Sequence, residues 1–189
     1  ELAQQGLPQT DWAVKFFQEL CDAVHILKFS SASVVGVEMP GFDVHSKQGL
    51  TSGTHPDRLA VLGHALRSIW HETNSDLWSD LVCLVQSEFG RTSLENGSFG
   101  TDHGQAGATF VLGGSVIGAV HNCDPQSWPA NATLFSAFDK YVEYRTDFRA
   151  ILAEILDRHL LLSPAEIDAV IPGWSSLSGP TFDYVGVLG

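Results

Sequence analysis

The stretch from Leu81 to Gly114 reads LVCLVQSEFGRTSLENGSFGTDHGQAGATFVLGG, and the interpretation of the whole chain starts from it. It opens with the apolar run 81–85, whose short length and β-branched residues predict a strand buried on both faces. A second apolar run, 109–112, predicts another strand and ends at two glycines. The segment between the runs is too polar and too rich in glycine to be part of a core. It predicts a loop that carries a functional site, because binding groups favour loops held by rigid strands.

Composition narrows the classes of protein to which the chain can belong. Its 189 residues, 44% of them apolar, predict one domain, 1–189, with an ordinary core. The formal charge is −12, so a nucleic-acid backbone would be repelled and no nucleic-acid partner is expected. This acidity is compatible with cation binding, although solubility explains it equally well. No apolar run approaches the ~20 residues that span a bilayer, and three cysteines make no disulfide framework.

Apolar spacing in the first half of the chain predicts two helices and two strands. The helices are expected at 11–27, capped by Asp11, and at about 56–70. A strand is expected at 33–39, ahead of the second helix and of the strand at 81–85. The order of strand, helix and strand is typical of a right-handed crossover between neighbouring parallel strands. The predicted fold class is therefore α/β, with a mostly parallel sheet flanked by helices.

The second half of the chain predicts shorter elements. The expected features, in order, are an edge strand at 116–120, an irregular segment at 121–144, a helix around 148–156, a short helix capped by Ser163, and a loosely held tail at 173–189.

Polar side chains follow the two predicted parallel strands at the points where they end. In an open α/β sheet, ligands bind outside the carboxyl ends of the strands, so these side chains are expected to share one edge. Mixed carboxylate and imidazole ligands suit zinc, manganese or iron, and calcium is a further candidate. The predicted divalent metal site consists of Asp43, His45, Glu88, Asp102 and His103.

Several residues of this site keep a second interpretation. Arg91 either pairs with Glu88 to hold the loop or binds an anionic ligand. Asp102 either ligates the metal or orients an imidazole from behind. For His45 and His103 the alternative is a hydrogen-bonded loop histidine. The other histidines lie in or beside helices and are expected to be structural or solvated, except that His121, near Asp124, is an additional ligand candidate.

Four segments carry a resemblance to a known family: GFDVHSKQ at 41–48, SEFGRT at 87–92, GTDHG at 100–104 and TDFRA at 146–150. In order and spacing they resemble the family catalogued as domain of unknown function 1501, over about residues 34–174. That family is similar to the sulfatases and alkaline phosphatases in its later half. Its members are typically bacterial, exported by a twin-arginine signal and about twice as long as this chain.

The resemblance implies an alkaline phosphatase-like fold and a role as the C-terminal, metal-binding part of a longer sulfatase-like domain. The upstream half of the same polypeptide is then an expected partner, and the expected location is periplasmic or extracellular. By the resemblance, Asp43, His45 and His103 bind a first metal, zinc before manganese, iron or calcium. Phe89 stands where the superfamily has an imidazole for a second metal. The superfamily's nucleophile is not found in this sequence.

Two functions follow from these expectations. In the first, the chain is the metal-binding half of a hydrolase that acts on small phosphate or sulfate esters, with Arg91 holding the anionic group through its two guanidinium N–H groups. In the second, it is a non-catalytic secreted binding or assembly protein that retains the fold and has a protein partner.

Overall fold

The computed structural model describes residues 10–122 and 140–189. The chain divides into two compact units. Unit 1 comprises Glu1–Trp78 with Glu95–Asp102, and unit 2 comprises Ser79–Leu94 with His103–Gly189.

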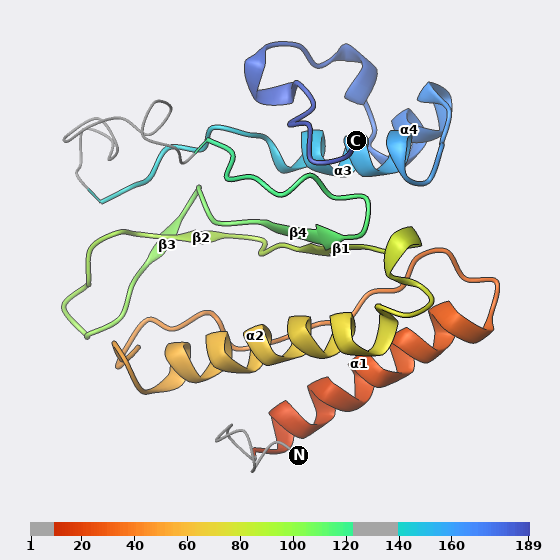
Figure 1. Cartoon of the computed structure of the whole chain (residues 1–189). Helices are drawn as coiled ribbons and strands as arrows, with labels where there is room; N and C mark the ends of the chain where they lie inside the picture. Colours follow the sequence, from red (N-terminus) through yellow and green to blue (C-terminus); the bar gives the residue numbers. More distant parts are fainter. Residues whose placement is uncertain (1–9, 123–139) are drawn as a thin grey trace. The chain divides into compact units, whose positions relative to one another are not determined.

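Unit 1 is built on two long helices, α1 (Asp11–Phe29) and α2 (Thr54–Thr73), which lie side by side (Figure 1). Ala13 and Phe16 of α1 pack against Val61 and Ala65 of α2 to form its core. The alanines let the two backbones approach closely, and Phe16 fills the space between them. Both predicted helices are thus confirmed, each slightly longer than expected. The N-cap of α1 is Thr10 and not Asp11, which lies in the first turn instead.

The segment 33–39, predicted as a strand, is extended but forms no strand in the described structure. Val37 and Met39 are half-buried against the core of α1 and α2, whereas Val34 is 70% exposed. Alternating burial is a signature of any extended segment with one covered face. Here a pair of helices covers that face, so the pattern does not indicate a sheet.

The described part of the chain contains two sheets, each of two antiparallel strands. β1 (Val82–Val85) pairs with β4 (Phe110–Gly113), and β2 (Gly90–Arg91) pairs with β3 (His103–Gly104). The predicted α/β fold with a mostly parallel sheet is therefore wrong. The prediction of an alkaline phosphatase-like core, which requires that sheet, is wrong as well. The strand at 81–85 pairs with the next apolar run along the chain, and an antiparallel pair needs a loop but no helical crossover.

The ribbon of β1 and β4 is the part of unit 2 that α3 (Phe148–Arg158) covers. Val82, Leu84 and Val111 pack against a core that includes Ile151 and Ile155 of α3. All four residues of β1 are half-buried. The unbroken apolar run therefore marks a strand of intermediate burial and not one buried on both faces.

The predicted helix that Ser163 caps is confirmed as α4 (Pro164–Val170). Its capping box is complete, and Glu166 Oε2 accepts a hydrogen bond from the Ser163 N–H at 2.8 Å. Ile167 of α4 packs against Ala153 and Leu156 of α3. Within the described residues, three short 3₁₀ turns complete the regular structure: η2 (Trp78–Asp80), η4 (Trp174–Ser176) and η5 (Pro180–Phe182).

The C-terminal segment is not the loosely held tail that its composition predicts. Leu188 is only 2% exposed, and its N–H donates to the buried carboxylate of Glu154 at 3.0 Å. Arg158 Nη1 donates to the Leu188 carbonyl at 2.7 Å. The predicted edge strand at 116–120 is reduced to one bridge between Val116 and Leu188. Most of the predicted irregular segment, 123–139, lies outside the described residues.

Within residues 10–122 and 140–189, no helix combines the length and the apolar character that crossing a bilayer requires, in line with the sequence.

Candidate metal site

Two segments far apart in the sequence build the part of unit 1 that carries Asp43, His45 and Asp102. The chain at 44–48 runs beside the loop at 98–101, and three backbone hydrogen bonds join them: Lys47 N to Ser98 O at 3.0 Å, Gln48 N to Phe99 O at 2.8 Å, and Thr101 N to Val44 O at 3.3 Å. Thr101 Oγ1 also donates to Gln48 Oε1 at 2.7 Å. The loop that carries Asp102 is therefore held against the segment that carries Asp43 and His45.

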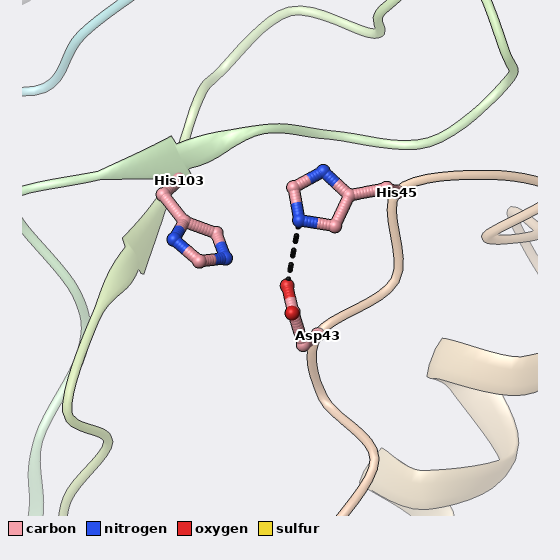
Figure 2. Close-up of side chains that lie close together, drawn as sticks. All are labelled: Asp43, His45 and His103. Atoms are coloured by element: carbon pink, nitrogen blue, oxygen red, sulfur yellow. Dashed lines mark ion pairs between the residues drawn. The ribbon is translucent and has the colours of Figure 1, made fainter.

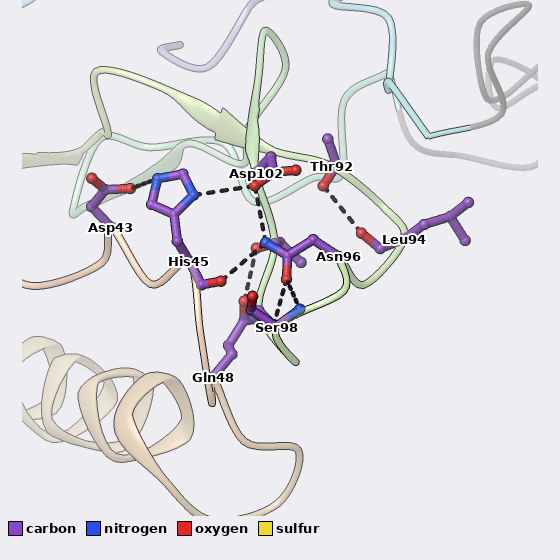
Figure 3. A network of polar contacts seen from close by, with 10 residues as sticks. Asp43, His45, Gln48, Thr92, Leu94, Asn96, Ser98 and Asp102 are labelled. Atoms are coloured by element: carbon purple, nitrogen blue, oxygen red, sulfur yellow. Dashed lines mark hydrogen bonds and ion pairs between the residues drawn. The ribbon is translucent and has the colours of Figure 1, made fainter.

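The imidazole of His45 lies between two carboxylates. Its Nε2 is 2.9 Å from Asp43 Oδ1, and its Nδ1 is 3.2 Å from Asp102 Oδ1 (Figures 2 and 3). About half of each of these three side chains is exposed to solvent. A metal-ligating histidine usually donates its other ring N–H to a carboxylate or carbonyl oxygen, and Asp102 stands where it can accept from His45 Nδ1. Of the two interpretations of Asp102, the geometry favours the one in which it orients an imidazole.

Asn96 holds Asp102 in this position. Its Nδ2 donates to Asp102 Oδ1 at 2.9 Å and to the carbonyl oxygen of His45 at 3.0 Å (Figure 3). Its Oδ1 accepts from the N–H groups of Ser98 at 2.9 Å and Gly100 at 3.2 Å. Asn96 is not among the site residues that the sequence predicts. The Asn-Gly pair at 96–97 is a known turn signal, but it does not indicate contacts with residues 45 and 102.

His103 lies in β3, where its partner across the ladder is Arg91 of β2. The ring of Phe89 stacks on the His103 imidazole, with 4.4 Å between centroids and 10° between planes. The Arg91 guanidinium carbon lies 5.4 Å from the centroid of the same Phe89 ring. Phe89, which by the resemblance only replaces a lost ligand, therefore supports the ring of His103.

Three of the five predicted ligand residues come together. One ligand atom from each of Asp43, His45 and His103 lies within 4.8 Å of the other two (Figure 2), and all three residues are exposed. His103 directly follows Asp102 in the chain, so one peptide bond joins it to the residue that contacts His45. Glu88 is exposed and is not a member of this group. Neither is His121, and Asp124 lies outside the described residues.

The donor set can be compared with what a metal needs. Zinc with bonds of about 2.1 Å to nitrogen and oxygen holds its ligand atoms about 3.4 Å apart. A group within 4.8 Å reaches this spacing with small side-chain rotations. Two imidazoles and a carboxylate also match the three-ligand sets of catalytic zinc sites, where a fourth position stays open. The residues therefore fit a zinc-like ion.

The described residues thus combine helices with two small antiparallel ribbons and a candidate metal centre of mixed imidazole and carboxylate ligands. The chain belongs to the family described as Protein of unknown function (DUF1501), whose model matches residues 14–133. The matched range contains all the residues of the candidate site. No curated protein and no solved structure matches the chain.

Proposed function

We propose that this chain binds one divalent metal ion through Asp43, His45 and His103, and that zinc is the preferred ion. The observation that carries the proposal is the convergence of these three ligand atoms within 4.8 Å of one another. Two imidazole nitrogens favour zinc over calcium or magnesium, which take oxygen ligands. Manganese and iron accept the same donors and are the nearest competitors.

The proposed role of the metal is in the hydrolysis of phosphate or sulfate esters. A bound divalent ion polarises an ester oxygen and stabilises charge that develops on it. The backbone of Arg91 lies beside that of His103, its partner in the β2–β3 ladder. A guanidinium binds a tetrahedral anion through paired N–H groups. This proposal rests on the site and on the sequence resemblance, because the sulfatase-like core is not part of the described structure. Export to the periplasm remains a prediction from the resemblance.

A second candidate function is a non-catalytic binding or assembly protein with one structural metal. The observation that favours it is the stacking of Phe89 on His103. An aromatic ring in this place cannot ligate the second metal that the resemblance to sulfatases and alkaline phosphatases implies.

Metal analysis tests the binding proposal. Purified protein loaded with zinc and then dialysed should retain about one ion per chain, as a site with three protein ligands predicts. His45→Ala and His103→Ala should each remove most of this metal, since two ligands rarely hold zinc. His64→Ala and His159→Ala are the matched controls and should retain it. A wild-type chain without zinc, or four variants that behave alike, would refute the site.

Anion binding separates the two functions. The zinc-loaded chain should bind inorganic phosphate in a calorimetric titration, whereas the metal-free chain and Arg91→Ala should bind it much more weakly. A phosphate affinity that changes neither on removal of zinc nor in Arg91→Ala would favour the non-catalytic role. Turnover of phosphate or sulfate monoesters is not expected from this chain, because it has no identified nucleophile. Hydrolysis that disappears when one of its Ser or Thr residues is changed would contradict this expectation.

A further inference from the structure

We propose that Asn96 is a positioning residue of the metal site, which acts through Asp102 to hold the imidazole of His45 with Nδ1 away from the metal and Nε2 toward it. The inference rests on the proposed metal-binding function and extends it to a residue that touches no proposed ligand atom.

The orientation of the Asn96 amide is fixed by its neighbours. Its oxygen faces two backbone N–H groups, those of Ser98 and Gly100, and these groups can only donate. A flipped amide would place its own N–H groups against them. The amide nitrogen must therefore face the two acceptors, Asp102 Oδ1 and the His45 carbonyl oxygen.

This orientation determines what Asp102 can do. Its Oδ1 accepts from Asn96 at 2.9 Å and lies 3.2 Å from His45 Nδ1. An ionised carboxylate has no proton to donate, so the contact with Nδ1 requires a proton on that nitrogen. Asp43 Oδ1, 2.9 Å from Nε2, competes for the ring proton by the same argument. The hydrogen bond from Asn96 keeps Asp102 beside Nδ1, so a cation that binds between Asp43 and His45 takes the lone pair of Nε2 and leaves the proton on Nδ1. This is the tautomer in which His45 can serve as a ligand beside Asp43.

Asn96 also acts on the main chain of His45. Its second N–H, donated to the His45 carbonyl at 3.0 Å, fixes the backbone from which the imidazole extends. One amide group thus restrains both the backbone of His45 and, through Asp102, the Nδ1 side of its ring. Outer contacts of this kind usually change metal affinity by about 10–100-fold when they are lost.

Asn96→Asp separates the positioning role from the role in shaping the loop. The aspartate keeps an oxygen that accepts from Ser98 and Gly100, but it loses both donors and sets a second carboxylate against Asp102. Gln18→Glu is the matched control, because it makes the same change of amide to carboxylate at an exposed position of α1.

Zinc affinity is measured by competition with a chromophoric chelator. We expect Asn96→Asp to raise the zinc Kd about 10–100-fold with one ion still bound at saturation, and Gln18→Glu to leave it unchanged. In an Asp102→Asn background, Asn96→Asp should add little further loss, because both changes break the same chain of contacts. A wild-type Kd in Asn96→Asp would overturn the inference, and so would full additivity of the two changes.

A second readout does not depend on zinc. In the metal-free chain labelled with ¹⁵N-histidine, the hydrogen bond to Asp102 should slow the exchange of the His45 Nδ1 proton enough for it to be observed. Asn96→Asp should abolish this signal, and an unchanged signal would refute the positioning role. If Asn96→Asp does not fold, Asn96→Ser supplies the same test, since its hydroxyl is too short to reach Asp102. If the wild-type protein binds no zinc, and the Nδ1 proton signal of the wild type is still lost in Asn96→Asp, then the proposed function alone is refuted.

Discussion

His45 depends on a residue that has no side chain. The backbone of Gly100 passes so close to His45 that a Cβ at position 100 would lie 2.3 Å from the carbonyl carbon of His45 and 2.4 Å from its oxygen. Gly100 is also the donor of one of the two N–H groups that orient the Asn96 amide. The glycine is therefore required for close approach of the chain to itself.

A first prediction concerns Gly100→Ala. The added methyl group must push the 98–101 loop away from His45, and overpacking of this kind costs about 1–3 kcal/mol. We expect a lower midpoint of urea unfolding and a weaker zinc affinity. Gly97→Ala in the same loop is the control, because a Cβ there would meet nothing within 4 Å. Equal effects of the two substitutions would show that the close contact at position 100 is unimportant.

At the scale of elements, α1 and α3 differ in how the free backbone N–H groups of their first turns find hydrogen-bond acceptors. Asp147 is the N-cap of α3, and its Oδ1 accepts from the N–H of Arg149 at 2.9 Å. The Arg149 guanidinium also binds both carboxylate oxygens, each at 2.8 Å. α1 begins without a side-chain cap, since no such hydrogen bond comes from Thr10. The start of α3 is therefore more dependent on one charged residue than the start of α1.

The charge of Asp147 makes this cap dependent on pH. The side-chain hydrogen bond from Arg149 lowers the pKa of the Asp147 carboxyl below its ordinary value of 3.8, helped by the Arg149 N–H and opposed by partial burial. A group whose pKa falls on folding stabilises the native state above its unfolded pKa. That stabilisation is lost as the pH falls through the lower, folded pKa.

Asp147→Ala should accordingly destabilise the protein by about 1 kcal/mol at pH 7, the usual contribution of an N-cap. The difference from wild type should shrink as the pH falls below about 4, the ordinary pKa of an aspartate, towards the lower pKa of the folded Asp147 carboxyl. Chemical unfolding monitored by circular dichroism at several pH values measures both effects. Asp11→Ala, at the uncapped start of α1, should cost less at pH 7. A difference that stays constant down to pH 2 would contradict the charged cap.

At the scale of the whole molecule, a charged side chain in each unit ties distant segments of that unit together. In unit 1, Lys28 near the end of α1 lies 3.0 Å from Asp76 beyond the end of α2, and it also donates to the Glu72 carbonyl. In unit 2, the fully buried Glu154 of α3 accepts from Gly186 at 2.8 Å and Leu188 at 3.0 Å. A buried carboxylate is stable only when such donors surround it.

Glu154→Gln should therefore release the C-terminal segment. The glutamine has one acceptor oxygen in place of two and turns its N–H groups toward a backbone donor, so we expect a loss of at least about 3 kcal/mol, as for a broken buried ion pair. Chemical unfolding gives this value, and hydrogen exchange of the Gly186 and Leu188 amides should accelerate. Glu143→Gln, at an exposed position, is the control. Unchanged exchange at these two amides would contradict the proposed anchor.

The sequence by itself determined the features that depend on neighbouring residues. Apolar residues at helical spacing, among them Phe16, Ile69 and Ile155, predict α1, α2 and α3 because one buried stripe recurs every 3.6 residues. The Ser163 capping box predicts α4 because its contacts span only three residues. The segments that carry Asp43, His45 and His103 were also recognisable, since short motifs keep their order and spacing along the chain.

Only the tertiary structure decided how distant segments pair. The run at 82–85 is equally apolar whether it joins a parallel sheet or an antiparallel ribbon, and its pairing with 110–113 depends on backbone hydrogen bonds that every residue can make. The same holds for Asn96, whose contacts with His45 and Asp102 cross 51 and 6 residues of chain. Side-chain patterns encode which face is covered, but the choice of the covering segment is made by the packing of the whole unit.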